Sequence, residues 1–144
     1  MKLTIELVPS TSWYKNLRDK YTPSAWQSIA KEVQKKANFT CEICGRKKPE
    51  QLKRLYCHEV WAYDDKTNTQ TLVGLQCLCF SCHLVKHLGY SQITDGIDYD
   101  SVVEHFLTVN NCTEEEFMEV QEEAFRVWKE RSEIEWIIDF GKWD

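Results

Sequence analysis

The sequence predicts an α+β fold, in which a β-hairpin followed by a short helix forms a zinc finger module with flanking helices. Three observations predict this fold: two Cys-X-X-Cys pairs, two β-rich segments between them, and helical spacing of hydrophobic residues on either side. A length of 144 residues with 42% hydrophobic residues matches one ordinary domain. We therefore expect a single domain over residues 1–144, with the zinc module at 22–90 and an acidic helical extension at 98–144 that packs on it.

The elements of the zinc module follow in chain order. Thr22 and Pro23 are typical of the N-cap and the first residue of a helix, which the hydrophobic spacing extends to about Ala37. Residues 52–63 and 70–75 are β-rich and are joined by a polar turn, so they predict a hairpin.

Segments on both sides complete the expected fold. Residues 2–8 alternate in hydrophobicity like a strand. After the second cysteine pair, a short helix is expected to end at Gly89. Residues 100–109 predict a further helix, and Thr113 opens a longer one with the pattern of a capping box. Residues 133–144 are expected to add a strand or an anchoring tail.

The two Cys-X-X-Cys pairs are the strongest chemical signal. A two-residue gap lets both thiolates of a pair reach one tetrahedral ion through a tight turn. Four thiolates leave no open position, so the ion would join two distant chain segments and contribute folding free energy. We predict a structural Zn²⁺ bound by Cys41, Cys44, Cys79 and Cys82, with Cys77 a less favourable substitute for Cys79.

The cysteine count and the hydropathy pattern bear on the compartment. Seven cysteines are an odd number, which fits metal binding in a reducing compartment better than a disulfide scaffold. The first residues lack the pattern of a signal peptide, and no run of about 18 hydrophobic residues occurs. We expect a soluble cytoplasmic protein with no membrane segment.

A second group of metal-binding residue types surrounds the hairpin. His83 and His87 are spaced i, i+4, which places both imidazoles on one helix face. Successive strand residues point to opposite faces, so only one of Cys57 and His58 should join them. If Cys57 is the third ligand, the coordination shell stays open and His58 is free to act as a general base. The alternatives are a closed zinc site that uses all four residues, and histidines that only pack beside the zinc finger.

Charge is unevenly distributed along the chain. Residues 1–100 carry 14 basic and 11 acidic residues, a balance of +3, whereas residues 101–144 carry 4 basic and 12 acidic residues, a balance of −8. A basic cluster in the first part is a candidate phosphate-contacting surface, and a solvated face explains such a run equally well. The candidates for nucleic-acid contact are Arg46, Lys47, Lys48, Lys53 and Arg54.

Together these motifs resemble the HNH (His-Asn-His, ββα-metal) endonuclease superfamily, in its cysteine-containing, zinc-binding type. The resemblance covers residues 26–90: a helix, the first cysteine pair, a strand that bears a histidine, and the second pair running into two more histidines. It implies an HNH-like ββα-metal fold in which His58 is the general base and in which Cys57, His83 and His87 hold the catalytic metal.

Two positions depart from the family pattern. The asparagine of the family would stand nine residues before His83, where this sequence has Gly74. The residue before the base is usually Asp or His, whereas here it is Cys57, and a thiol favours zinc over magnesium.

The leading hypothesis is a metal-dependent HNH-type endonuclease that hydrolyses DNA phosphodiester bonds. His58 would deprotonate water, and a second divalent ion (Zn²⁺, Mg²⁺, Mn²⁺ or Ni²⁺) would stabilise charge on the scissile phosphate. The alternative is a catalytically inactive zinc-binding module that binds nucleic acid, or a protein partner through residues 98–144. A further alternative is an acidic interaction protein in which the finger is only a scaffold.

Overall fold

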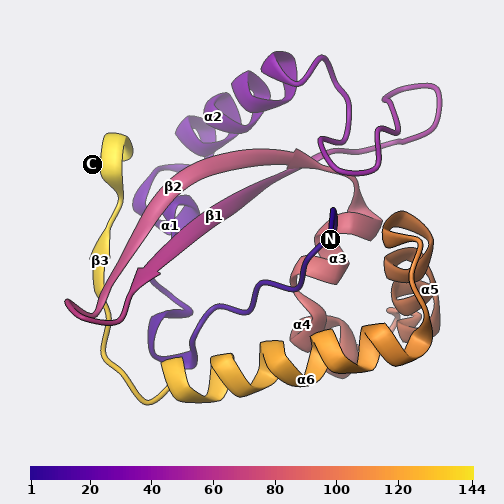
Figure 1. The fold of residues 1–144 in the computed structure, drawn as a ribbon. Helices are drawn as coiled ribbons and strands as arrows, with labels where there is room; N and C mark the ends of the chain where they lie inside the picture. Colours follow the sequence, from indigo (N-terminus) through magenta and orange to yellow (C-terminus); the bar gives the residue numbers. More distant parts are fainter.

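The computed structural model describes residues 1–144 and has a three-stranded sheet surrounded by helices, so the predicted α+β class is confirmed (Figure 1). Strands β1 (Tyr56–Asp64) and β2 (Thr69–Leu78) form an antiparallel hairpin, and β3 (Ile137–Asp139) pairs parallel to β2. The strand order β1-β2-β3 leaves β1 at a free edge of the sheet.

Helices flank the hairpin on several sides. In Figure 1, α2 lies on one side of the hairpin and α6 on the other, while α3, α4 and α5 gather beyond its end. The helical segments are η1 (Ser10–Ser12), α1 (Leu17–Lys20), α2 (Pro23–Lys36), α3 (Phe80–Lys86), α4 (Leu88–Ile93), α5 (Tyr99–Asn110), α6 (Glu114–Arg131) and η2 (Gly141–Trp143).

Capping residues begin the two longest helices where the sequence predicts. The Thr22 hydroxyl accepts a hydrogen bond from the Ala25 amide at 3.2 Å, and Pro23 follows in the first turn of α2. At α6 the Thr113 and Glu116 side chains bond reciprocally to each other's backbone amides. Both predicted helix starts are confirmed.

The helix after the second cysteine pair ends earlier than expected and is followed at once by another helix. The backbone of His87 leaves the helical conformation, with φ −105° and ψ 52°, and α3 therefore stops at Lys86. The chain resumes a helix directly in α4, so Gly89 lies inside α4 and does not end a helix. The expectation that Gly89 ends the helix is wrong because the break comes two residues earlier.

The N-terminal segment is extended but forms no strand. The Leu3 amide donates to the Asn110 side-chain oxygen, and the Asn110 amide donates to the Leu3 carbonyl, both at 2.8 Å. Further along, the Glu6 amide donates to the Lys86 carbonyl at 3.1 Å. The strand predicted at 2–8 is absent because helix ends, and not another strand, satisfy these backbone groups.

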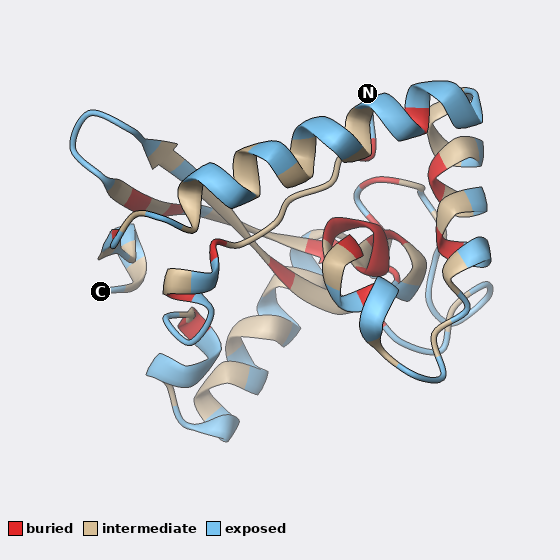
Figure 2. Cartoon of the chain, turned by 90° about the horizontal axis from the view of Figure 1, so that it is seen from below, coloured by how far each residue is buried: buried red, intermediate tan, exposed pale blue.

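The main hydrophobic core lies around α3 and not under the hairpin. Figure 2 shows buried residues gathered on α3 and on one side of α5. Phe106 of α5 and Phe117 of α6 meet edge to face there, with ring centroids 5.1 Å apart. The buried residues of this core are Leu3, Cys41, Ile43, Leu78, Cys79, Cys82, Leu84, Val85, Leu88, Val102, Phe106 and Phe117.

The longest helix, α6, runs along the surface and keeps its outer side exposed (Figure 2). Phe117 is its buried residue, and its first turn carries three consecutive glutamates. No helix in the chain combines the length and the apolar character that crossing a membrane requires.

Candidate functional site

Four cysteines converge where the loop after α2 meets the start of α3. Their sulfur atoms all lie within 4.8 Å of one another, and three of the four side chains are buried. Cys79 is the N-cap of α3, and its sulfur accepts a hydrogen bond from the Cys82 amide at 3.4 Å. The Cys-X-X-Cys spacing therefore becomes a helix cap and the first turn of a helix.

The first cysteine pair is held in a tight turn. The Gly45 amide donates to the Cys41 carbonyl at 3.0 Å, and Gly45 has a positive φ of 81°, which glycine adopts without a Cβ penalty. The Glu42 amide donates to the Cys77 carbonyl at 2.9 Å and joins this turn to β2. Cys77 belongs to β2, where it pairs with Cys57, and is not a member of the four-cysteine cluster.

Cationic and neutral donors surround the four sulfurs. Arg46 donates to the sulfurs of Cys44 and Cys79 at 3.5 and 3.6 Å, and a His105 ring nitrogen lies 3.2 Å from the sulfur of Cys82. A guanidinium beside two sulfurs offsets the negative charge that thiolate ligands carry. The donor set therefore fits a metal ion such as zinc, which this cluster could hold.

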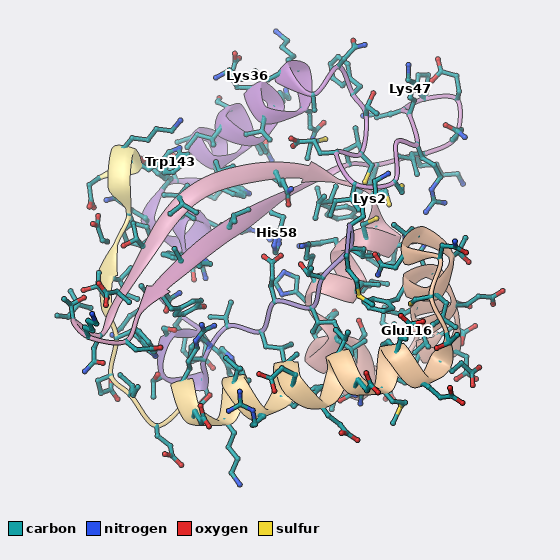
Figure 3. The ribbon with its side chains drawn as sticks, viewed as in Figure 1. Lys2, Lys36, Lys47, His58, Glu116 and Trp143 are labelled. Carbon is teal, nitrogen blue, oxygen red and sulfur yellow. The ribbon has the colours of Figure 1, made fainter.

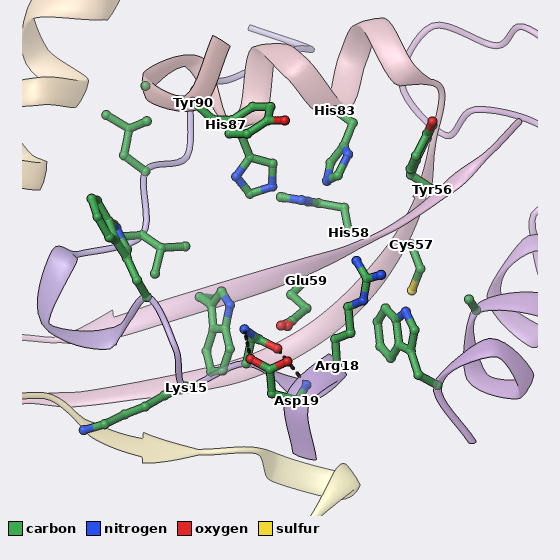
Figure 4. Close-up of a pocket in the computed structure, with 18 of the residues that line it drawn as sticks. Lys15, Arg18, Asp19, Tyr56, Cys57, His58, Glu59, His83, His87 and Tyr90 are labelled. Atoms are coloured by element: carbon green, nitrogen blue, oxygen red, sulfur yellow. Dashed lines mark hydrogen bonds between the residues drawn. The ribbon is translucent and has the colours of Figure 1, made fainter. Parts of the chain in front are cut away.

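Three histidines form a second cluster between β1 and α3. Their ligand atoms lie within 4.8 Å of one another, and their ring centroids are 5.5 Å (His58 to His83), 5.2 Å (His58 to His87) and 4.7 Å (His83 to His87) apart. Figure 4 shows the three imidazoles pointing toward one another, one from the strand and two from the helix. The two histidines that the i, i+4 spacing places on one side of α3 therefore lie next to the strand histidine His58.

The imidazoles of His83 and His87 favour the neutral form. Burial, followed by the proximity of His87 and His58, lowers the pKa of His83 to about 3. Burial and the proximity of His58 likewise lower the pKa of His87 to about 4. Neutral imidazoles are the form that coordinates metal ions.

Cys57 lies outside the histidine cluster. Tyr56 stacks on His83 with ring centroids 5.4 Å apart, and His58 also meets His83, so residues 56 and 58 share the face toward α3. Strand alternation then turns Cys57 to the opposite face. Burial and the proximity of Glu59 raise the pKa of Cys57 to about 12, which keeps it a neutral thiol. The structure thus groups His58, and not the predicted Cys57, with the two helix histidines.

A carboxylate from the N-terminal segment contacts the strand histidine. Glu6 Oε1 lies 3.4 Å from His58 Nε2, and the other carboxylate oxygen is paired with Lys86, whose ammonium also donates to Thr4 at 2.8 Å. Burial opposes ionisation of Glu6, but hydrogen bonds to His58 and Lys86 hold its pKa at about 2. Figure 3 shows His58 extending from the hairpin toward the N-terminal segment. A charged carboxylate of this kind fixes the orientation of an imidazole.

Sequence reasoning missed Glu6 and His105. Glu6 lies 52 residues from its partner, which no local motif reveals. One signal was available for His105, because the chain has four histidines and all four lie at the two clusters. Gly74, where the family would have asparagine, pairs with Val60 beside an irregularity in the hairpin and contacts neither histidine cluster nor cavity.

The histidine cluster opens into a cavity of about 1240 Å³ (Figure 4). Two of the predicted nucleic-acid contacts, Lys48 and Arg54, line it, together with Lys15 and Arg18, which the sequence did not single out. The other predicted contacts do not line it: Arg46 faces the four cysteines, and Lys47 and Lys53 are exposed elsewhere. The cavity is therefore lined both by the three clustered histidines and by exposed cations.

Comparisons with protein-family models, with curated proteins and with solved structures found no match to this chain.

If the four-cysteine cluster binds zinc, replacing one of its cysteines should release that zinc. Cys41→Ser removes one of four sulfurs, so bound zinc should fall by one equivalent per chain and the free energy of unfolding should fall by several kcal/mol. Metal analysis after gel filtration and urea denaturation measure both. The matched control is Cys112→Ser, which alters a half-buried cysteine outside the cluster and should keep its zinc. Equal zinc content in the two variants would contradict the assignment.

The two neutral histidines predict a pH dependence of stability. Their folded pKa values of about 3 and about 4 lie below the ordinary value of 6.5, so the unfolded chain takes up protons first as the pH falls. Above pH 6.5 both states are neutral and the histidines contribute nothing to the pH dependence. Between pH about 6.5 and about 4, the free energy of unfolding should fall by up to about 1.4 kcal/mol per pH unit for each histidine. Urea denaturation without ions at this cluster measures the slope, which His83→Asn should make shallower.

Proposed function

We propose that this chain is a metal-dependent endonuclease of HNH type that hydrolyses DNA phosphodiester bonds. The observation that carries the proposal is the meeting of three histidines from β1 and α3 at a cavity lined by exposed cations. The hairpin followed by a helix, with cysteine pairs before and after the hairpin, supports the ββα-metal assignment. The resemblance at residues 26–90 supplies the type of nuclease.

His83 and His87 are the residues that would hold the second divalent ion. Neutral imidazoles suit Zn²⁺ and Ni²⁺ better than Mg²⁺, which prefers oxygen ligands. Bound there, the ion would stabilise negative charge on the scissile phosphate and on the leaving oxygen. With two protein ligands, such an ion would keep coordination positions free for a phosphate group.

His58 is assigned as the general base that takes a proton from the attacking water. A base needs a fixed ring orientation, and the Glu6 carboxylate at 3.4 Å from Nε2 provides it. In this proposal Glu6 orients the base, which is the role of the asparagine in the family. Glycine at position 74 has no side chain that could take this role. Lys86 in turn fixes Glu6, and because Lys86 is only 4% exposed, it needs this carboxylate as a counter-charge.

Exposed cations around the cavity provide affinity for the phosphate backbone. Lys15, Arg18, Lys48 and Arg54 are exposed, and none of them takes part in an ion pair within the chain. Such contacts are electrostatic and position a nucleic acid without reading its sequence. α6 contributes Phe125 and Trp128 to the cavity lining but none of its carboxylates. Those carboxylates would be repelled by DNA, so we place the acidic face of α6 away from the bound strand.

The test of the function is cleavage of a plasmid and of a circular single-stranded DNA, each with Mg²⁺, Mn²⁺, Ni²⁺, Zn²⁺ or EDTA. Wild-type protein should cleave at least one of the two DNAs with at least one of the ions, and neither with EDTA. His58→Ala should lower the rate by roughly 10²- to 10⁴-fold, since it removes the proton acceptor. Cys57→Ser, at the neighbouring strand position, should cleave like wild type because Cys57 lines the cavity but is not a member of the three-histidine cluster, and serine changes the side chain little.

Metal content separates the outcomes of this experiment. His58→Ala should keep both metal equivalents, and loss of the second one would make His58 a ligand. Loss of cleavage in Cys57→Ser would restore the ligand set expected from the family. No cleavage by wild type with any ion would favour the zinc-binding module that acts through a protein partner of residues 98–144.

Glu6 is predicted to be a positioning residue. Glu6→Gln alone would leave the Lys86 charge buried and unpaired, which is strongly destabilising. The double variant Glu6→Gln/Lys86→Met removes both charges, so it should fold with wild-type metal content and still lose about 10- to 100-fold in kcat. Lys86→Met alone keeps the carboxylate beside His58 and should lose less. Equal kcat in the two Lys86→Met proteins would contradict a positioning role for Glu6.

A further inference from the structure

We infer that the cavity takes its DNA as a single strand, with unpaired bases stacked on Trp13 and Tyr90 at the cavity mouth. This inference rests on the proposed function, because it names the form of the substrate at the same site. Its basis is an unusual gathering of aromatic side chains with unpaired cations.

Aromatic residues are concentrated in the lining of this one cavity. Four of the six tryptophans of the chain line it, together with three of the six tyrosines. Three of these rings, those of Tyr56, Trp61 and Trp128, contact other aromatic rings of the protein, as Trp61 does with Phe140 at 5.9 Å between centroids. The rings of Trp13 and Tyr90 differ, because they line the cavity and are nevertheless 53% and 56% exposed.

The side chain of Trp13 is fixed in place although its ring is exposed. Its indole nitrogen donates to the Val8 carbonyl at 2.7 Å, which satisfies the polar atom and fixes the ring. A ring that is already ordered loses little conformational entropy when a base stacks on it. Exposing a fixed indole at a cavity mouth costs hydrophobic free energy, which a stacked base would recover.

Tyr90 connects the aromatic rim to the histidine cluster. It lies in α4, three residues after His87, and projects beside that histidine in Figure 4. A base stacked on Tyr90 would therefore bring its own phosphate groups close to His87 and His58. Across the cavity, Lys15 and Arg18 belong to the segment that follows Trp13 and can contact the backbone of the same strand.

Stacking and charge together favour a single strand over a duplex. In a duplex both faces of each base are covered by neighbouring bases, so rings at a cavity mouth have nothing to stack on. In a single strand the bases are free to turn onto aromatic rings while the phosphates stay on the cations. The cavity of about 1240 Å³ also exceeds the 300–1,000 Å³ typical of small-molecule pockets, which fits a chain of nucleotides better than one small ligand.

The test is the affinity of the zinc-loaded full chain for a fluorescein-labelled DNA of about twelve nucleotides, single-stranded or annealed to its complement. Fluorescence anisotropy is recorded with no added divalent ion, so that binding is read without cleavage. The single strand should bind at least tenfold more tightly than the duplex. Trp13→Ala and Tyr90→Ala should each weaken single-strand binding by about tenfold, as expected for the loss of one stacked base. Trp13→Phe, which keeps a ring, should restore most of the affinity.

Tyr14→Ala is the matched control, because Tyr14 is the neighbour of Trp13, is 86% exposed and does not line the cavity. It should bind both DNAs like wild type. Equal or tighter binding of the duplex, or wild-type affinity in both Trp13→Ala and Tyr90→Ala, would overturn the inference. A single-strand preference that depends on both rings supports it even if no ion produces cleavage, in which case only the endonuclease proposal fails. Efficient nicking by wild type, Trp13→Ala and Tyr90→Ala alike would overturn this inference alone.

Discussion

The convergence of four cysteine thiols on the start of α3 is the constraint on which the site depends. Cys79 caps this helix and Cys82 lies in its first turn, while His83 follows within the helix and His87 is the residue that ends it. A helix advances only about 1.5 Å per residue, so fixing its first turn also fixes the histidines at its end. The same cluster ties the loop after α2 to β2 through Glu42. Strand and helix histidines therefore meet because the cysteines place the helix against the hairpin.

The N-terminal segment is the second element that the site requires. Asn110 binds both backbone groups of Leu3, which attaches the segment to α5, and Lys86 holds the Glu6 carboxylate beside His58. The acidic extension is thus connected to the histidine cluster through a strap of a few extended residues. The acidic helical region thus anchors the N-terminal segment, and it reaches the cavity through the aromatic side chains of Phe125 and Trp128 and not through its carboxylates.

Local patterns predicted the parts of the structure that local physics determines. Capping residues located the helix starts, alternation located the hairpin, and the Cys-X-X-Cys spacing identified the four clustered cysteines because a tight turn can bring such pairs to one point. Alternation also separated Cys57 from His58, but the side of the hairpin that α3 covers is a tertiary property, so the sequence did not determine which residue joins the histidines. Contacts such as Glu6 with Lys86, 80 residues apart, leave no periodic trace. The extended segment at 2–8 was predicted as a strand for the same reason.

The parallel pairing of β3 with β2 has a consequence for the order of folding. Thr69 pairs with Ile137, and Tyr21 donates to the Trp143 carbonyl at 2.6 Å, so the sheet is completed by segments far apart in the chain. Closing such long loops costs more entropy than forming the hairpin between adjacent strands. We expect the hairpin and cysteine turns to form first, and the β2 edge to remain an unpaired template until residues 137–139 arrive. During that interval the chain is most exposed to pairing with a second copy of itself.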